Sequence, residues 1–72
     1  MATLDGTKLQ RIRKLMHKTQ AEMAEAADTS ERYIRDLEKG RKRDPSARIV
    51  HGCASFLGVS MEELMTTQKE EP

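Results

Sequence analysis

The sequence predicts an all-α fold in which five short helices form one compact domain. Apolar residues recur at three- and four-residue spacing, which is the period of a helix, and no segment shows the alternation expected of a strand. Aromatic residues make up 3% of the chain, and a core built mainly from Leu, Ile, Val, Met and Ala favours helices over an all-β packing. Loops of about two to six residues then require neighbouring helices to pack around a shared centre.

Local signals predict where the helices begin. The expected helices cover residues 5–17, 20–27, 31–39, 46–57 and 61–67. Thr19 with Glu22, and Ser60 with Glu63, each fit a capping box. In a capping box a hydroxyl and a carboxylate each bind an amide that is free at a helix start, so these residues predict the starts of the second and fifth helices.

The remaining helix starts and ends are predicted from individual capping and turn residues. Ser30 can cap the third helix, and Asp44-Pro45-Ser46 opens the fourth because proline is tolerated only in the first turn. Gly40 and Gly58 follow the third and fourth helices, where a residue with a left-handed backbone would end them. We expect the domain to cover residues 1–65 and residues 66–72 to form a flexible polar tail.

Length and composition exclude several classes of protein. A chain of 72 residues has room for one small domain, because chains of this size bury only about 60% of their unfolded surface. Cys53 is the single cysteine and cannot form an internal disulfide, and no Cys/His spacing predicts a metal, so we expect neither metal nor cofactor. No run approaches the roughly 18 apolar residues of a membrane helix, and no signal peptide is visible, which predicts a cytoplasmic protein without membrane association.

The sequence does not predict an enzyme. His51 and Cys53 lie two residues apart on one helix, so their side chains diverge by about 200°, and no third group is placed to orient either. Cys53 is therefore expected to be a small core residue. No glycine-rich loop of the phosphate-binding type is present in the sequence.

The net charge of +1 hides a strong segregation of charge along the chain. Residues 1–18 carry five bases and one acid, whereas residues 19–28 carry three acids and no base. Residues 29–48 carry seven bases and four acids, and residues 60–72 one base and four acids. Basic segments in a nearly neutral chain are typical of an oriented anion-binding face, and a solvated charged surface is the alternative.

Residues 20–39 match a helix-turn-helix, in which a short turn joins two helices at a steep angle. Such a pair needs a small residue where the helices touch, and Ala24 lies there. The apolar inner faces are formed by Met23, Ala27, Ile34 and Leu37. Asp28 in the turn can adopt a left-handed backbone at modest cost. Any short helical hairpin shares much of this pattern, so the outward face of the second helix is more informative.

That outward face is basic. At about 100° per residue, a helix that buries Ile34 and Leu37 turns its other side outward. The other side carries Arg32, Arg35, Asp36 and Lys39, with Glu31 and Tyr33 at its edges, and the following turn adds Arg41, Lys42 and Arg43. A helix fits the major groove, and cations beyond its end can meet neighbouring phosphates, so this face is predicted to bind double-stranded DNA. A solvated helix face is the alternative.

Several segments in combination resemble the phage repressor and Cro type of helix-turn-helix domain, the XRE family. These segments are Thr19-Gln20-Ala21-Glu22-Met23-Ala24, Ile34 to Gly40, the Asp-Pro-Ser at 44–46, and the Leu-Gly-Val-Ser-Met-Glu-Glu-Leu at 57–64. The resemblance covers residues 6–65 without a gap. It implies a five-helix domain of the lambda/434 repressor-like type that binds operator DNA as a dimer, with the third helix in the major groove.

The resemblance also implies roles for individual residues. Gln20 matches a residue that contacts a phosphate and braces a base-reading side chain. The positions that contact bases or backbone are Ser30, Glu31, Arg32 and Asp36, and the loop contacts to phosphate are Lys39, Arg41 and Arg43. Arg13 and Glu38 match a partly buried ion pair that ties the first helix to the end of the third. Loss of one member would leave the other charge unpaired.

The chain departs from the family pattern at three positions. His17 near the end of the first helix and Asp28 in the central turn occupy positions where glycine is usual, and Lys18 replaces an apolar residue. We expect His17 to be exposed at the helix end, with a contact to DNA as the alternative.

The acids on the outward face require partners, because phosphates would otherwise repel them. Our hypothesis is that Arg32 reads guanine through its two-pronged guanidinium group, while Asp36 orients Arg32 or Arg35. The amino group of a cytosine is an alternative partner for Glu31 or Asp36.

The fourth helix has more apolar surface than one core requires. If Val50, Cys53, Ala54 and Leu57 face inward, other apolar residues project to a second side. We expect Ile49, Phe56 and, from the fifth helix, Met61 to form a homodimer interface, with Gly52 reducing the bulk between Ile49 and Phe56. A wide core stripe that buries Ile49 and Phe56 is the alternative.

Together these features predict a sequence-specific DNA-binding transcriptional regulator, a repressor of phage, plasmid or bacterial origin, that binds a pseudo-palindromic operator as a dimer. The alternative is an antitoxin-like or accessory module whose fourth-helix surface and acidic tail bind a protein partner. A steep fall of DNA affinity with salt would distinguish the first function from the second.

Overall fold

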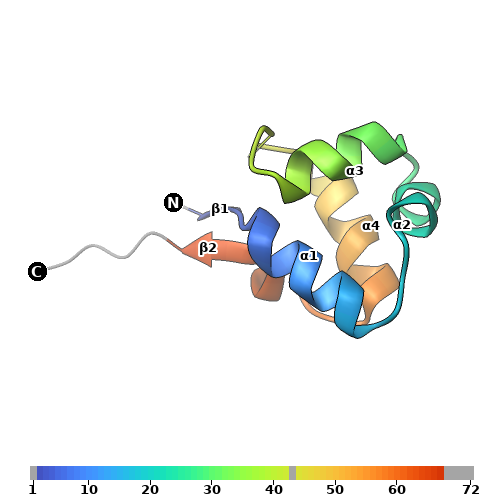
Figure 1. Cartoon of the computed structure of the whole chain (residues 1–72). Helices are drawn as coiled ribbons and strands as arrows, with labels where there is room; N and C mark the ends of the chain where they lie inside the picture. The colour runs from blue at the N-terminus through green and yellow to red at the C-terminus, as the bar shows by residue number, and fades with distance from the viewer. Residues whose placement is uncertain (1, 43, 68–72) are drawn as a thin grey trace, which may run out of the picture.

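Four α-helices, one 3-10 helix and a two-stranded sheet make up the part of the chain that the computed structural model describes, residues 2–42 and 44–67 (Figure 1). In chain order they are β1 (Ala2–Leu4), α1 (Gly6–Leu15), α2 (Gln20–Ala26), α3 (Glu31–Glu38), α4 (Ala47–Leu57), η1 (Met61–Leu64) and β2 (Met65–Thr67). No helix in these residues is both long enough and apolar enough to cross a membrane.

The predicted helix starts are confirmed, because polar side chains cap them. Thr19 Oγ1 accepts a hydrogen bond from the Glu22 amide at 3.0 Å, and Glu22 Oε1 accepts one from the Thr19 amide at 2.9 Å. This second bond favours the ionised carboxylate and lowers the pKa of Glu22. Ser30 caps α3 through the Tyr33 amide at 3.0 Å. Ser46 caps α4 in the same way.

The predicted fifth helix is wrong in type and in length. The capping box of Ser60 and Glu63 is present, but it opens a four-residue 3-10 helix, η1. The chain then extends into β2, which pairs antiparallel with β1 in the register Ala2↔Thr67, Thr3↔Thr66 and Leu4↔Met65. A cap signals only that a turn begins, whereas the pairing of Met65–Thr67 depends on a strand at the other end of the chain.

This pairing also corrects the expectation that no strand forms. Residues 66 and 67, which were predicted to begin the flexible tail, belong to β2. The remainder of the predicted tail, residues 68–72, lies outside the described residues.

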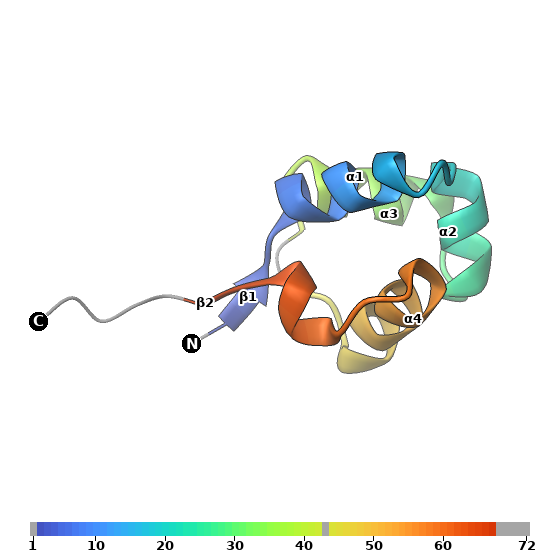
Figure 2. The same ribbon diagram turned by 90° about the horizontal axis from the view of Figure 1, so that it is seen from below.

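The hydrophobic core lies between the helices, and every helix contributes to it. Its most deeply buried members are Leu9, Met23, Ile34, Leu37, Cys53, Leu57 and Leu64. Figure 2 shows α1 and α3 along one side of the molecule and α4 along the other, with α2 at one end and the two strands at the opposite end. Helices of this length are marginal alone in water, so burial of their apolar faces in this shared core stabilises them.

Two residues outside the helices have a left-handed backbone without being glycine. His17 follows α1 and Asp28 follows α2, and each has a φ of 59°. Asp28 therefore has the conformation predicted for the turn, and His17 is exposed beyond the end of its helix, as expected. Both positions are those at which glycine is usual in the resembling family, and the backbone conformation explains that preference.

Helix α1 approaches α3 closely at Gly6. A Cβ atom added to Gly6 would lie 2.8 Å from the carbonyl oxygen of Glu38 and still closer to that of Leu37. Both obstacles are backbone atoms of the last turn of α3. The missing side chain of Gly6 therefore sets the distance between the start of α1 and the end of α3.

We expect Gly6→Ala to lower the free energy of unfolding by about 1 to 3 kcal/mol, because the α3 backbone must shift to admit the methyl group. In an open helix the same change would stabilise the protein by roughly 0.5 to 1 kcal/mol. Urea denaturation followed by circular dichroism measures the difference, and Thr7→Ala, at the exposed neighbouring position, is the matched control. Unchanged stability of Gly6→Ala would contradict the close approach.

Candidate nucleic-acid interface

Helix α3 has one buried flank and one exposed cationic flank. Ile34 and Leu37 are 0% and 1% exposed and face the core. The side chains of Arg32, Arg35 and Lys39 are exposed. The three cations thus lie on the flank that the helical periodicity assigns to solvent. Figure 1 shows α3 itself at the periphery of the molecule.

Helix α2 and the turn after it hold α3 in place. Ala24 in α2 and Ala27 just after it are buried, at 4% and 3% exposure, and α2 packs against α3. The turn closes by a hydrogen bond from the Thr29 amide to the Ala24 carbonyl at 2.9 Å, and Ser30 then caps α3. Helix α2 therefore supports α3, while the cationic flank of α3 stays exposed.

The basic loop after α3 folds back onto the helix. Gly40 ends α3 with a φ of 79°, and the amides of Arg41 and Lys42 both donate to the Asp36 carbonyl, at 2.9 and 3.3 Å. The ammonium group of Lys42 lies 5.5 Å from the centre of the Tyr33 ring, within the range of a cation–π interaction. The loop cations therefore lie beside the exposed flank of α3. Arg43, which was predicted to join them, lies outside the described residues.

The acids of this surface pair with cations in a way that differs from the hypothesis. Asp36 was expected to orient Arg32 or Arg35, but its carboxylate lies 3.8 Å from the guanidinium group of Arg41. Arg35 instead pairs with Glu31, one helical turn earlier, at 3.8 Å. The reason is the return of the loop, which brings Arg41 next to Asp36, a contact that helical periodicity alone does not reveal.

A buried ion pair joins α1 to the end of α3. Arg13 Nε donates to Glu38 Oε2 at 2.6 Å, and a second Arg13 nitrogen donates to Glu38 Oε1 at 3.1 Å. These are the two residues that the resemblance implied, and they are 8% and 6% exposed. Arg13 also donates to the Lys18 carbonyl at 2.8 Å, and Gln20 Nε2 donates to Glu38 Oε1 at 3.0 Å.

The hydrogen bond from Gln20 to Glu38 is a contact that the sequence did not predict. Gln20 was expected to contact a phosphate, and its amide is held by the buried carboxylate of Glu38. The side-chain orientation at the start of α2 is thereby coupled to the ion pair between α1 and α3. A hydrogen bond from a side chain of α2 to one of α3 has no signal in local periodicity.

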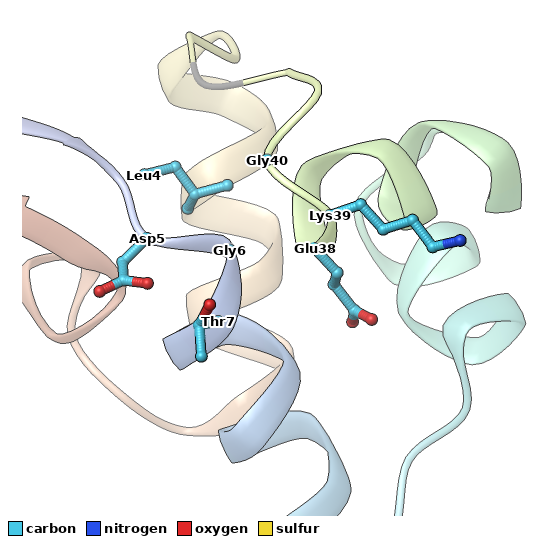
Figure 3. Close-up of a pocket in the computed structure, with 7 residues that line it drawn as sticks. All are labelled: Leu4, Asp5, Gly6, Thr7, Glu38, Lys39 and Gly40. Atoms are coloured by element: carbon cyan, nitrogen blue, oxygen red, sulfur yellow. The ribbon is translucent and has the colours of Figure 1, made fainter.

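An open pocket of about 270 Å³ lies where α1 meets the end of α3. It is lined by Leu4, Asp5, Gly6, Thr7, Glu38, Lys39 and Gly40 (Figure 3). Figure 3 shows the Lys39 side chain extending away from Asp5 and Thr7. Lys39 thus borders both the pocket and the cationic flank of α3, and its ammonium group points away from the pocket residues of α1.

The residues predicted to form a dimer interface differ in their burial. Ile49 is 7% exposed and belongs to the core of its own chain, so its expected projection to a second side is wrong. Phe56 and Met61 are partly buried and pack against the same core. The ammonium group of Lys18 lies 5.1 Å from the centre of the Phe56 ring. Helix α4 buries a wide stripe because α2 packs on one of its sides and η1 on another.

Gly52 also differs from expectation. It was expected to reduce bulk at a partner surface, but a Cβ atom there would lie 2.9 Å from the Cα of Ala27. The glycine therefore permits close packing of α4 against the end of α2 within the chain.

Cys53 is a core residue, as its position predicted. Burial, and secondarily the charge of Glu38, raise the pKa of its thiol to about 11. The thiol is thus protonated near neutral pH and is poorly nucleophilic. In residues 2–42 and 44–67, no group of three or more His, Cys, Asp and Glu side chains could hold a metal ion.

Two short helices joined by a tight turn, the second with a cationic outer flank, define a helix-turn-helix domain. The sequence model of the Helix-turn-helix family matches residues 9–64, and the chain belongs to this family. The resemblance to the phage repressor and Cro type is thereby confirmed.

Two relatives bear the name HTH-type transcriptional regulator. The relative from Sinorhizobium fredii is 36% identical over 72 residues, which is 100% of this chain and 92% of the relative. The relative from Methanocaldococcus jannaschii is 34% identical over 64 residues, 89% of this chain and 96% of the relative.

Solved structures share the fold. The clp gene regulator ClgR from Corynebacterium glutamicum has 32% identity and a TM-score of 0.76 over 82% of this chain, which is 62% of the ClgR chain and so less than two thirds of it. SinR from Bacillus subtilis, the master regulator for biofilm formation, was solved in complex with DNA. It has 25% identity and a TM-score of 0.76 over 82% of this chain and 94% of the SinR chain.

We expect Glu38→Leu to destabilise the protein by about 3 to 5 kcal/mol, because it leaves the Arg13 guanidinium buried without its partner. The double variant Arg13→Met/Glu38→Leu should recover much of this loss, since it leaves no unpaired charge. Glu31→Gln, which removes one member of the exposed pair with Arg35, is the control and should cost less than about 1 kcal/mol. Urea denaturation measures all three. Equal losses for the Glu38 and Glu31 variants would contradict a structural role of the buried pair.

Proposed function

We propose that this chain is a cytoplasmic, sequence-specific DNA-binding transcriptional regulator of bacterial or phage type, and that it acts as a repressor. In this proposal α3 enters the major groove of an operator, and two copies bind the two halves of a pseudo-palindromic site. The observation that carries the proposal is the cationic flank of α3, which is exposed along its length while the opposite flank is buried. The names of the relatives and the DNA complex of SinR support it.

The roles of the interface residues follow from their chemistry. Arg32 has no ion pair within the described residues, so its guanidinium is available to bind the two acceptors of a guanine. Lys39, Arg41 and Lys42 are exposed at the end of α3 and are suited to phosphates. The proposed interface also includes Gln20, Ser30, Glu31, Tyr33, Arg35, Asp36 and Arg43.

We expect Arg32→Ala to weaken binding to the best duplex from an in vitro selection by about 1 to 3 kcal/mol and to relax one base position. Lys39→Ala should weaken binding similarly for all sequences and reduce the salt slope by about one unit, because a phosphate contact releases counterions. Fluorescence anisotropy across a salt series measures both variants. Equal loss by Arg32→Ala on selected and random duplexes would contradict a base-reading role.

Dimerisation is proposed to use the surface around Phe56 and Met61, whose side chains are partly buried against the core to which Ile49 belongs. A two-fold pair would set two copies of α3 about 34 Å apart, which is one turn of DNA. We expect sedimentation velocity to show two copies on an operator duplex with two half-sites. One copy bound at full affinity to an isolated half-site would contradict this arrangement.

A protein-interaction module is the second candidate. Leu15 and Met16 at the end of α1 are 68% and 47% exposed, and large apolar side chains at this exposure favour a protein partner. The two functions differ in salt dependence. A steep loss of duplex affinity with added salt supports the regulator, whereas salt-insensitive binding of a protein together with no duplex binding supports the module.

A further inference from the structure

The proposed DNA surface contains acids that occupy some of its own cations. Among the described residues, Arg35 pairs with Glu31 and Arg41 pairs with Asp36, each at 3.8 Å. Arg32 and Lys39 on the same surface have no ion pair within residues 2–42 and 44–67. The surface is therefore divided into cations that are free to meet DNA and cations that an acid of the same chain holds.

Asp36 is better placed than Glu31 to hold a cation of this surface away from DNA. Its carbonyl accepts both loop amides, from Arg41 and Lys42, so its backbone and the loop are held together independently of its carboxylate. The Asp36 side chain is 29% exposed, whereas that of Arg41 is 69% exposed. The carboxylate is thus confined against the protein, and the arginine is the partner that is free to leave.

A phosphate that approaches Arg41 must displace this carboxylate. In a loose, non-specific complex the attraction to phosphates is electrostatic and weakened by solvent and salt, so a carboxylate already in position competes effectively. When α3 is fully seated in the groove, base contacts hold the backbone of the DNA close, and a phosphate can take the place of the carboxylate. The same acid therefore penalises loose complexes more than seated ones.

We infer that Asp36 is a specificity-determining residue that competes with phosphates for Arg41 and so suppresses binding to non-cognate DNA. This inference rests on the proposed function. It assigns Asp36 no contact with a base. Glu31 plays the same part for Arg35, but Glu31 lies in the first turn of α3, where its charge also stabilises the helix start, so Asp36 gives the cleaner test.

The test compares Asp36→Asn with the wild-type chain on a short duplex of random sequence and on a duplex selected in vitro. Asparagine removes the charge and leaves the carbonyl that anchors the loop. An exposed ion pair of about 0.2 to 1 kcal/mol corresponds to roughly 1.4- to 5-fold in affinity, so we expect a gain of this size on random DNA. The salt slope should steepen by up to about 0.9, the value for one added phosphate contact. The ratio of selected to random affinity should fall.

Two controls separate competition from a change of net charge. Glu62→Gln removes the same charge from η1, which lies on the side of the molecule remote from α3 (Figures 1 and 2), and should leave the random-duplex affinity nearly unchanged. In an Arg41→Ala background, Asp36→Asn should produce no steepening of the salt slope, because the released cation is absent. Circular dichroism checks that each variant folds.

The outcomes are distinct. A wild-type chain that binds neither duplex overturns the proposed function. If the wild type binds, a gain by Asp36→Asn that matches Glu62→Gln, or that persists unchanged without Arg41, overturns the inference. A loss on the selected duplex with no gain on random DNA also overturns it, because Asp36 would then be contacting a base.

Discussion

The contact between the first helix and the last turn of α3 governs the orientation of the cationic flank. Arg13 and Glu38 form it with two hydrogen bonds in a nearly solvent-free position, and Gly6 permits the two backbones to meet. Apolar contacts at Ile34 and Leu37 specify which flank of α3 faces inward but tolerate small rotations and shifts. A bidentate ion pair does not tolerate such rotations and shifts, because its atoms must meet at fixed distances and angles. The pair therefore sets the position of α3 along and about its axis.

A buried ion pair is weak evidence for net stability, since taking two charges out of water offsets most of their attraction. In this chain the ion pair between Arg13 and Glu38 fixes the position of α3 relative to α1. Gln20 extends the pair to α2, so one carboxylate group touches side chains from α1 and α2 while belonging to α3. A change at the start of α2 or within α1 is thus transmitted to the helix that carries the cations.

Near the end of α3, one residue likewise makes two contacts that position the following loop. One residue, Asp36, anchors the loop through its carbonyl and pairs with Arg41 through its carboxylate. His17 and Asp28 show a related compromise, because each adopts a left-handed backbone that costs a non-glycine residue about 1 to 2 kcal/mol. Both lie just after a helix and let the chain turn within a few residues. The short connections that give the domain its shape are thus obtained at some cost in local strain.

Much of the candidate site was accessible from the sequence because its signals are local. Capping residues such as Thr19 and Ser30 bind amides three positions away, and the two flanks of α3 follow from the helical repeat within eight residues. The resemblance added Arg13 and Glu38, which are 25 positions apart and have no local signal. What could not be predicted involves partners that are distant in sequence or sit beyond a turn, such as the pairing of Asp36 with Arg41 and the hydrogen bond from Gln20 to Glu38.

The sequence by itself determined the helix starts, the helix-turn-helix and the outward direction of the cations, since each depends on residues within about one or two turns of each other. Only the tertiary structure decided that residues 65–67 extend along β1, that Ile49 is core and that Gly52 faces Ala27. A strand needs a partner and a buried flank needs a neighbour, and for these segments both are supplied by parts of the chain that local periodicity does not connect.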